Sequence, residues 1–121
     1  MGFKILIVDD ALFMRNLLRG ILEEVGWEIV GEAGDGVEAV QKYKELRPDV
    51  ATMDIVMPLK SGIEALSEII AFDKGAKVVV CSAMGQESLV KEAQLAGAKG
   101  YILKPFDAQR VKEVIRKVAG R

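Results

Sequence analysis

Polar side chains stand at the ends of four short apolar runs in this sequence. Asp9 and Asp10 follow the first run, and Asp54, Ser82 and Lys104 close three others. Carboxylate oxygens are preferred ligands of hard divalent cations such as Mg²⁺. A metal ion, an ammonium group and a hydroxyl group can surround a phosphoryl group during its transfer, while a carboxylate acts as the nucleophile. These residue types therefore indicate phosphoryl chemistry at an acidic metal site.

Three carboxylates at one place would repel each other, by a few kcal/mol for two charges ~4 Å apart at an effective dielectric constant of about 20. A bound cation would offset that repulsion. The sequence has no His and one Cys, which excludes a Cys/His zinc site, a disulfide framework and catalysis by His. The metal must be held by oxygen, and Mg²⁺ is the cofactor that this set of residues predicts.

The elements that must position these groups alternate along the chain. Ile5–Val8 is continuously apolar and β-branched, which is typical of a strand buried on both faces, and the next residues carry apolar side chains at helical spacing from Met14 to Val25. The same alternation predicts further strand and helix pairs at Glu28–Glu32 and Val37–Leu46, Asp49–Asp54 and Ile63–Phe72, Lys77–Ser82 and Glu87–Ala96, and Gly100–Lys104 and Ala108–Ala119.

Five strand–helix units predict a single α/β domain over residues 1–121. Parallel strands joined by right-handed helical crossovers form an open, doubly wound sheet with helices on both faces. Ligand sites in such sheets lie beyond the carboxyl ends of the strands. Taken singly, an acidic pair after a strand is usually a solvated turn. Four polar strand ends at one edge of a sheet favour a functional site instead.

Charge and hydropathy exclude other classes of protein. The 17 Lys and Arg residues nearly balance 18 Asp and Glu residues, and no run of like charges occurs. The chain therefore lacks the basic stripe needed to bind nucleic acid or an anionic membrane. The apolar stretch before Asp9 is too short for a signal peptide or a membrane span. We expect a cytoplasmic protein that binds neither nucleic acid nor membrane.

The polar strand ends lie within four longer segments, Ile5–Asp10, Met53–Pro58, Cys81–Met84 and Gly100–Phe106. These segments resemble the receiver domains of two-component response regulators. The likeness spans the whole chain and is strongest for the free-standing chemotaxis receivers of Gram-positive bacteria and Thermotoga. It implies a flavodoxin-like sandwich with five parallel strands in the order 2-1-3-4-5, and a response regulator of chemotaxis that is activated by phosphorylation. Phe13–Arg15 and Cys81–Gln86 mark the chemotaxis type.

The resemblance also implies a role for each acidic residue. Asp54 would accept a phosphoryl group from a histidine kinase. Asp10, Asp54 and the backbone carbonyl of Val56 would bind Mg²⁺ directly, and Asp9 would act mostly through bound water. Together these residues would form the metal and phosphoacceptor site.

Other residues would bind the phosphoryl group and transmit the signal. Lys104 and Ser82 would bind the phosphoryl oxygens, and Tyr101 resembles an aromatic switch that turns inward when Ser82 moves. Val90, Tyr101 and Leu103 are candidates for the surface that binds a partner. Ordinary core packing is an equal alternative for Val90 and Leu103, because apolar side chains are mostly buried.

Two backbone features follow from the same resemblance. The Lys104–Pro105 peptide bond would be cis. Leu59–Ser61 departs from the common family pattern, in which an acidic residue or Asn precedes the glycine, but Gly62 still allows a positive φ in this loop. The departure affects partner preference near the loop and none of the site residues.

The implied partners are a histidine kinase of the CheA kind, a flagellar motor switch protein of the FliM kind and a phosphatase of the CheC or CheX type. The protein would be a monomer and not a metabolic enzyme, since it would catalyse only its own phosphorylation and dephosphorylation. Three alternatives stay open: a phosphorelay intermediate, an isolated receiver domain of a larger regulator, or an inactive scaffold.

Overall fold

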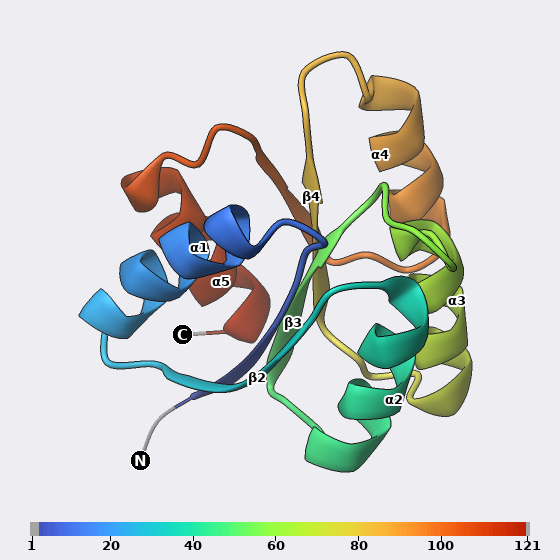
Figure 1. Ribbon diagram of the computed structural model, residues 1–121, viewed down its shortest axis with the longest axis horizontal. Helices are drawn as coiled ribbons and strands as arrows, with labels where there is room; N and C mark the ends of the chain where they lie inside the picture. The colour runs from blue at the N-terminus through green and yellow to red at the C-terminus, as the bar shows by residue number, and fades with distance from the viewer. Residues whose placement is uncertain (1–2, 121) are drawn as a thin grey trace.

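A parallel sheet of five strands runs through the middle of the molecule (Figure 1). The computed structural model describes residues 3–120. The strands are β1 (Lys4–Val8), β2 (Glu28–Ala33), β3 (Val50–Asp54), β4 (Val78–Ser82) and β5 (Gly100–Leu103), and the helices are α1 (Leu12–Glu24), α2 (Gly36–Leu46), α3 (Gly62–Phe72), α4 (Glu87–Leu95) and α5 (Ala108–Ala119). The strand order is β2-β1-β3-β4-β5, so the predicted flavodoxin-like fold is confirmed.

Every predicted strand and helix is present, and the differences lie at their ends. β2 continues one residue further than expected, to Ala33, and β5 ends one residue earlier, at Leu103. Lys104 therefore lies in the loop that follows β5. Its peptide bond with Pro105 is cis, as the family resemblance implies.

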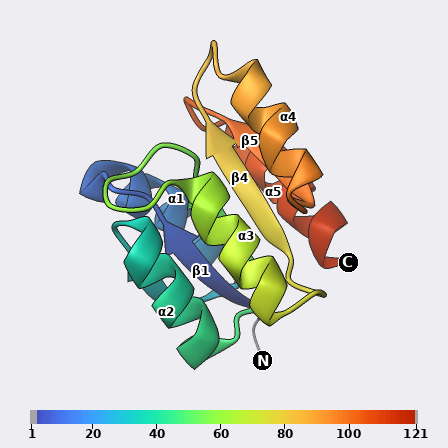
Figure 2. The ribbon, with the colours of Figure 1, turned by 90° about the vertical axis from the view of Figure 1, so that its right-hand side faces the viewer.

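Helices cover both faces of the sheet, with α1 and α5 on one face and α2, α3 and α4 on the other (Figures 1 and 2). Side chains alternate between these faces along β1. Ile5 and Ile7 pack with residues of α1 and α5, whereas Leu6 and Val8 pack with residues of α2 and α3. Because both faces are covered, the strand has no polar face, which explains its continuous apolar sequence.

Side-chain caps fix where three helices begin. Asp35 accepts a hydrogen bond from the backbone N–H of Glu38 at the start of α2, and Asp107 caps α5. Ser61 and Glu64 form a reciprocal capping box at the start of α3. These caps satisfy N–H groups that have no partner within the helix. They also fix the ends of three of the loops that lead away from the carboxyl ends of the strands.

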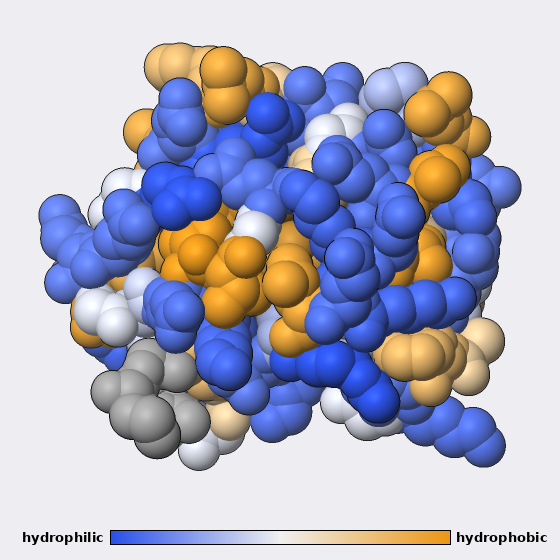
Figure 3. Space-filling model, turned by 60° about the horizontal axis from the view of Figure 1, so that its bottom comes forward, coloured by the Kyte–Doolittle hydropathy of each residue, from blue (hydrophilic) through white to orange (hydrophobic). Residues whose placement is uncertain are grey.

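The outer surface is mainly hydrophilic on the face drawn in Figure 3, where apolar side chains form small separate groups. Within residues 3–120, none of the helices has the length and apolar character needed to cross a membrane.

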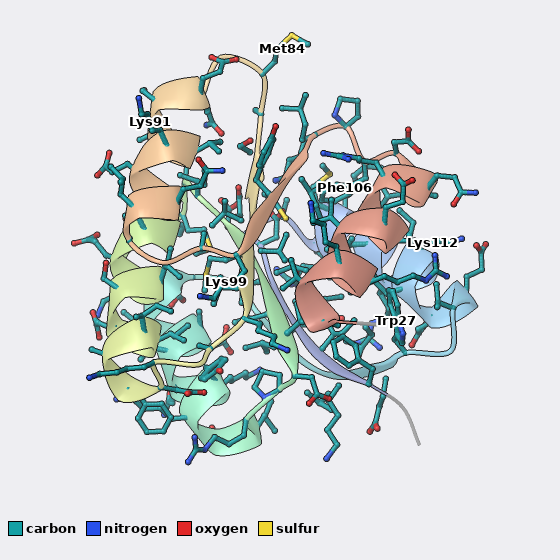
Figure 4. All side chains as sticks on the ribbon, turned by 180° about the vertical axis from the view of Figure 1, so that it is seen from behind. Trp27, Met84, Lys91, Lys99, Phe106 and Lys112 are labelled. Carbon is teal, nitrogen blue, oxygen red and sulfur yellow. The ribbon has the colours of Figure 1, made fainter. Side chains whose placement is uncertain are left out.

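Trp27 lies against the ring of Phe3, with ring centroids 5.9 Å apart, and below the guanidinium of Arg116 (Figure 4). The single tryptophan is therefore a packing residue.

Thr52 lies in the central strand β3, with no exposed surface. Its hydroxyl oxygen has no hydrogen-bond partner in the part of the chain that the structure describes. A buried hydroxyl without a partner is destabilising, because it has lost its hydrogen bonds to water and gained none. Threonine at position 52 is therefore not the residue that gives the fold its greatest stability.

We expect Thr52→Val to raise the free energy of unfolding by about 1 kcal/mol, since valine has nearly the shape of threonine and no hydroxyl group. Urea unfolding of the two proteins measures this difference. The reverse change two residues earlier, Val50→Thr, is the matched control and should lower stability. A Thr52→Val protein clearly less stable than wild type would mean that the hydroxyl is satisfied by a buried water molecule.

Candidate functional site

The carboxyl ends of β1 and β3 bring three carboxylates together. One oxygen of each of Asp9, Asp10 and Asp54 lies within 4.8 Å of the others. Asp9 and Asp54 are buried, with 4% and 8% of their surface exposed, whereas Asp10 is exposed. The site is therefore a small acidic pocket that opens to solvent at Asp10. All of its side-chain donor atoms are oxygen, the type of ligand that Mg²⁺ takes.

Lys104 reaches this pocket from the loop after β5, the strand at one edge of the sheet. Its ammonium nitrogen lies 2.7 Å from Asp9 Oδ2 and 3.4 Å from Asp54 Oδ2. The backbone N–H of Lys104 donates to the carbonyl of Ser82 at 2.7 Å, which anchors the loop beside β4. Burial lowers the pKa of Lys104, but its hydrogen bond with Asp9 and the charge of Asp54 outweigh burial and raise the pKa. The side chain is thus a fixed positive charge in the pocket.

The pocket disfavours the charge on Asp54. Burial and the neighbouring charge of Asp9 raise the pKa of Asp54 to about 6, although Lys104 acts in the opposite direction. The positive charge of Lys104 therefore does not fully compensate the negative charge of the three carboxylates. A divalent cation would supply the missing positive charge.

The loop after β3 approaches the pocket closely at Gly62. The N–H of Gly62 donates to the carbonyl of Ile55 at 2.7 Å, and a Cβ atom at position 62 would lie 2.0 Å from the carbonyl oxygen of Asp54. Gly62 does not use the positive φ that glycine allows; in this loop Leu59 takes that conformation, with φ 68°. Glycine is needed at position 62 because the start of α3 touches the backbone of Asp54.

The side chain and carbonyl of Val56 differ in their surroundings. The side chain is 55% exposed, and the carbonyl accepts no hydrogen bond from residues 3–120. The carbonyl is thus available to a ligand. Leu59 and Met84 are also exposed, at 84% and 79%, and Met84 lies at the tip of the loop after β4 (Figure 4). Apolar side chains therefore stand around an acidic site.

The residues predicted for switching and partner binding share one cleft. A cleft of about 420 Å³ between α4 and β5 is lined by residues that include Ser82, Val90, Tyr101 and Leu103. Ser82 is buried, Val90 is half-buried, and Tyr101 and Leu103 are 41% and 45% exposed. The core-packing alternative holds in part for Val90, which packs against the core, and does not hold for Leu103. The sequence alone did not predict that Ser82 joins this cleft.

Sequence reasoning gave no role to Arg15, which contacts the acidic turn. Its guanidinium Nη1 donates to the backbone carbonyl of Asp9 at 2.6 Å. The signals in the sequence were its place in Phe13–Arg15, a segment that resembles chemotaxis receivers, and its position five residues after Asp10. These signals are weak, because arginines are mostly exposed.

The fold and the acidic pocket define a class of protein, and comparison with known families agrees with it. Residues 5–116 match the response regulator receiver domain, and the chain belongs to this family.

The relatives define the class more narrowly as a CheY-like receiver domain of chemotaxis. The chain is 56% identical to chemotaxis protein CheY of Thermotoga maritima, over 98% of this chain and 99% of that protein. It is 55% identical to CheY of Bacillus subtilis, over 97% and 98% of the two chains. A crystal structure of the CheX-CheY-BeF3-Mg+2 complex from Borrelia burgdorferi is similar, with a TM-score of 0.92, 44% identity, and coverage of 96% of this chain and 88% of that one.

Proposed function

We propose that this chain is a chemotaxis switch that accepts a phosphoryl group on Asp54 from a histidine kinase and signals by binding a flagellar motor switch protein. The observation that carries the proposal is the buried Asp54 carboxylate, which has Lys104 at 3.4 Å and the oxygens of Asp9 and Asp10 within 4.8 Å. This arrangement combines a nucleophile, a cation and metal ligands in one pocket.

The donor set fits a magnesium ion. Asp10, Asp54 and the free carbonyl of Val56 would hold the ion directly, and Asp9 would hold it through water. When bound, Mg²⁺ neutralises negative charge on the carboxylate and phosphoryl oxygens. Burial and the charge of Asp9 raise the pKa of Asp54 despite the neighbouring Lys104, and a bound cation would favour the charged form of this carboxylate.

In the proposed reaction, a carboxylate oxygen of Asp54 attacks the phosphorus atom of a phosphohistidine. The new O–P bond forms as the N–P bond breaks, and the departing imidazole keeps the electron pair and takes a proton from solvent. The chain contains no His, so the donor must be another protein. Lys104 and the Ser82 hydroxyl donate hydrogen bonds to the phosphoryl oxygens and hold the group in place.

The signal passes through the cleft that Ser82 shares with Tyr101 and Leu103. A hydrogen bond from Ser82 to the phosphoryl group exists only after transfer, so it stabilises one position of this residue over another. Movement of Ser82 changes one wall of the cleft, and with it the shape offered to the motor protein. The protein acts as a monomer in the cytoplasm and catalyses only its own phosphorylation and dephosphorylation.

The similarity to the CheX–CheY complex supports a phosphatase of the CheX type as a further partner. The 56% identity to the Thermotoga CheY, over 99% of that protein, supports a function in chemotaxis. The phosphorelay alternative predicts transfer of the phosphoryl group from Asp54 to a second His domain. Incubation of the phosphorylated protein with such a domain, and separately with a motor switch peptide, distinguishes the two functions.

Labelling with a small phosphodonor tests the chemistry without any partner. The chain is incubated with acetyl phosphate and Mg²⁺, and the intact mass is measured by mass spectrometry. We expect one phosphoryl group per chain, on Asp54, and none when EDTA replaces Mg²⁺. Labelling that is independent of Mg²⁺, or that occurs at another residue, would contradict the proposal.

A further inference from the structure

Arg15 connects the acidic turn to the edge strand of the sheet. Near the start of α1, its Nη1 donates to the backbone carbonyl of Asp9 at 2.6 Å, and its Nε donates to the Glu32 carboxylate of β2 at 2.9 Å. The Arg15 side chain is only 18% exposed. One guanidinium group therefore holds the β1–α1 turn against β2 by two charge-assisted hydrogen bonds.

This contact matters most for Asp10. The carbonyl of Asp9 belongs to the same planar peptide group as the nitrogen of Asp10, so fixing the carbonyl also fixes the direction in which Asp10 leaves the turn. Asp9 has further support, from the N–H of Ala11 at 2.9 Å and from Lys104 at 2.7 Å. Asp10 is exposed, and its carboxylate accepts no hydrogen bond from residues 3–120. The position of the Asp10 carboxylate therefore depends on the orientation of the Asp9–Asp10 peptide group.

The charge of Arg15 is compensated where it stands. Glu32 binds Arg15 at 2.9 Å and Arg19 at 2.6 Å, and Arg19 also pairs with Glu23 at 3.2 Å. The two arginines and two glutamates form a chain of alternating charge with no net charge. A positive group can thus stand beside the acidic turn without strongly repelling a cation.

We propose that Arg15 is a positioning residue for the divalent cation, which it serves by fixing the Asp9–Asp10 peptide group. The inference rests on the proposed function of the acidic pocket as a magnesium site. Partners that orient metal ligands typically change metal affinity by tenfold to a hundredfold when they are removed. Arg15 orients its ligand through the backbone, so we expect an effect near the lower end of that range.

Isothermal titration of the full chain with MgCl₂ tests this role. We expect Arg15→Met to weaken Mg²⁺ binding about tenfold. Electrostatics alone predicts tighter Mg²⁺ binding by Arg15→Met, because the substitution removes a positive charge near an acidic site. Equal or tighter binding by Arg15→Met would therefore overturn the inference.

Arg19→Met is the matched control. It removes the same charge one turn further along α1 and also loses a bond to Glu32, but Arg19 does not contact the carbonyl of Asp9. Its Mg²⁺ affinity should equal or slightly exceed that of wild type. A tenfold loss in Arg19→Met as well would show that the charge network, and not the Asp9 contact, maintains the site.

Two further measurements keep the test decisive. Urea unfolding establishes that each variant is folded, and Arg15→Gln replaces Arg15→Met if the latter does not fold. Saturating Mg²⁺ should restore acetyl phosphate labelling of the Arg15 variant, because Arg15 touches none of the reacting groups. Absence of Mg²⁺ binding by wild type would refute the proposed function itself, whereas unchanged binding by the variant would refute only the role of Arg15.

Discussion

Replacement of Asp54 by Asn is expected to abolish phosphoryl labelling and, at the same time, to make the metal-free protein more stable. The amide cannot act as the nucleophile, so no acyl phosphate forms at position 54. Stability rises because the pocket then contains one buried charge fewer, and Asp9 no longer faces a second carboxylate on β3. We expect a gain of about 1–2 kcal/mol in the free energy of unfolding near pH 7.5 in EDTA.

The gain should depend on pH in a definite direction. The pKa of Asp54 is raised to about 6 in the folded protein, above a value of about 3.9 in the unfolded chain. Wild type loses stability relative to Asp54→Asn as the pH rises through this interval, because folding then requires an unfavourable buried charge. Below the lower value the carboxyl group is protonated in both states, and the difference between the two proteins should vanish.

Urea unfolding in EDTA and in Mg²⁺, together with mass spectrometry after acetyl phosphate treatment, checks these expectations. Wild type should gain about 2.7 kcal/mol at a hundredfold excess of Mg²⁺ over its dissociation constant. Asp10→Asn is the control, and it should stabilise the metal-free protein slightly while keeping the nucleophile. If both Asn variants were clearly less stable in EDTA, the carboxylates would be structural and the functional interpretation would weaken.

The second large effect is expected at Gly62, where alanine should destabilise the fold by about 3 kcal/mol or more. A Cβ atom there would lie 2.0 Å from the carbonyl oxygen of Asp54 and 2.8 Å from the Cα atom of Ile55. Both are backbone atoms, so no side chain can turn away to make room. Either α3 or the end of β3 must move, and Asp54 would move with it.

Gly20→Ala provides the matched control. Gly20 lies within α1, and nothing stands within 4 Å of the Cβ that alanine would add. Alanine should therefore stabilise the protein by about 0.5–1 kcal/mol, because glycine is unfavourable in a helix. Urea unfolding of both variants, with acetyl phosphate labelling of the folded fraction, makes the comparison. A Gly62→Ala protein within 1 kcal/mol of wild type would show that the loop can relax around the methyl group.

The sequence predicted the α/β fold class and the meeting of polar strand ends because both follow from periodicity, whereas the strand order was implied by the family resemblance. Apolar runs and helical spacing define the elements, and the carboxyl ends of parallel strands must lie at the same edge of the sheet. This is why Asp9, Asp54 and Ser82 could be placed together from the chain alone.

Details that depend on side-chain reach could not be predicted in this way. That Lys104 binds Asp9 more closely than Asp54 is decided by a difference of less than 1 Å. The contact of Arg15 with a backbone carbonyl leaves no pattern in the sequence. The need for glycine at position 62 reflects how two backbone segments approach, and the same residue type also fits a positive φ.

The ion pair between Lys104 and Asp9 joins residues that are 95 positions apart, one following the last strand and the other the first. Contacts of such long sequence separation close large loops and depend on nearly all of the chain being in place. If Asp54 accepts a phosphoryl group as proposed, Lys104 can assist the transfer only in a chain whose sheet is complete from β1 to β5.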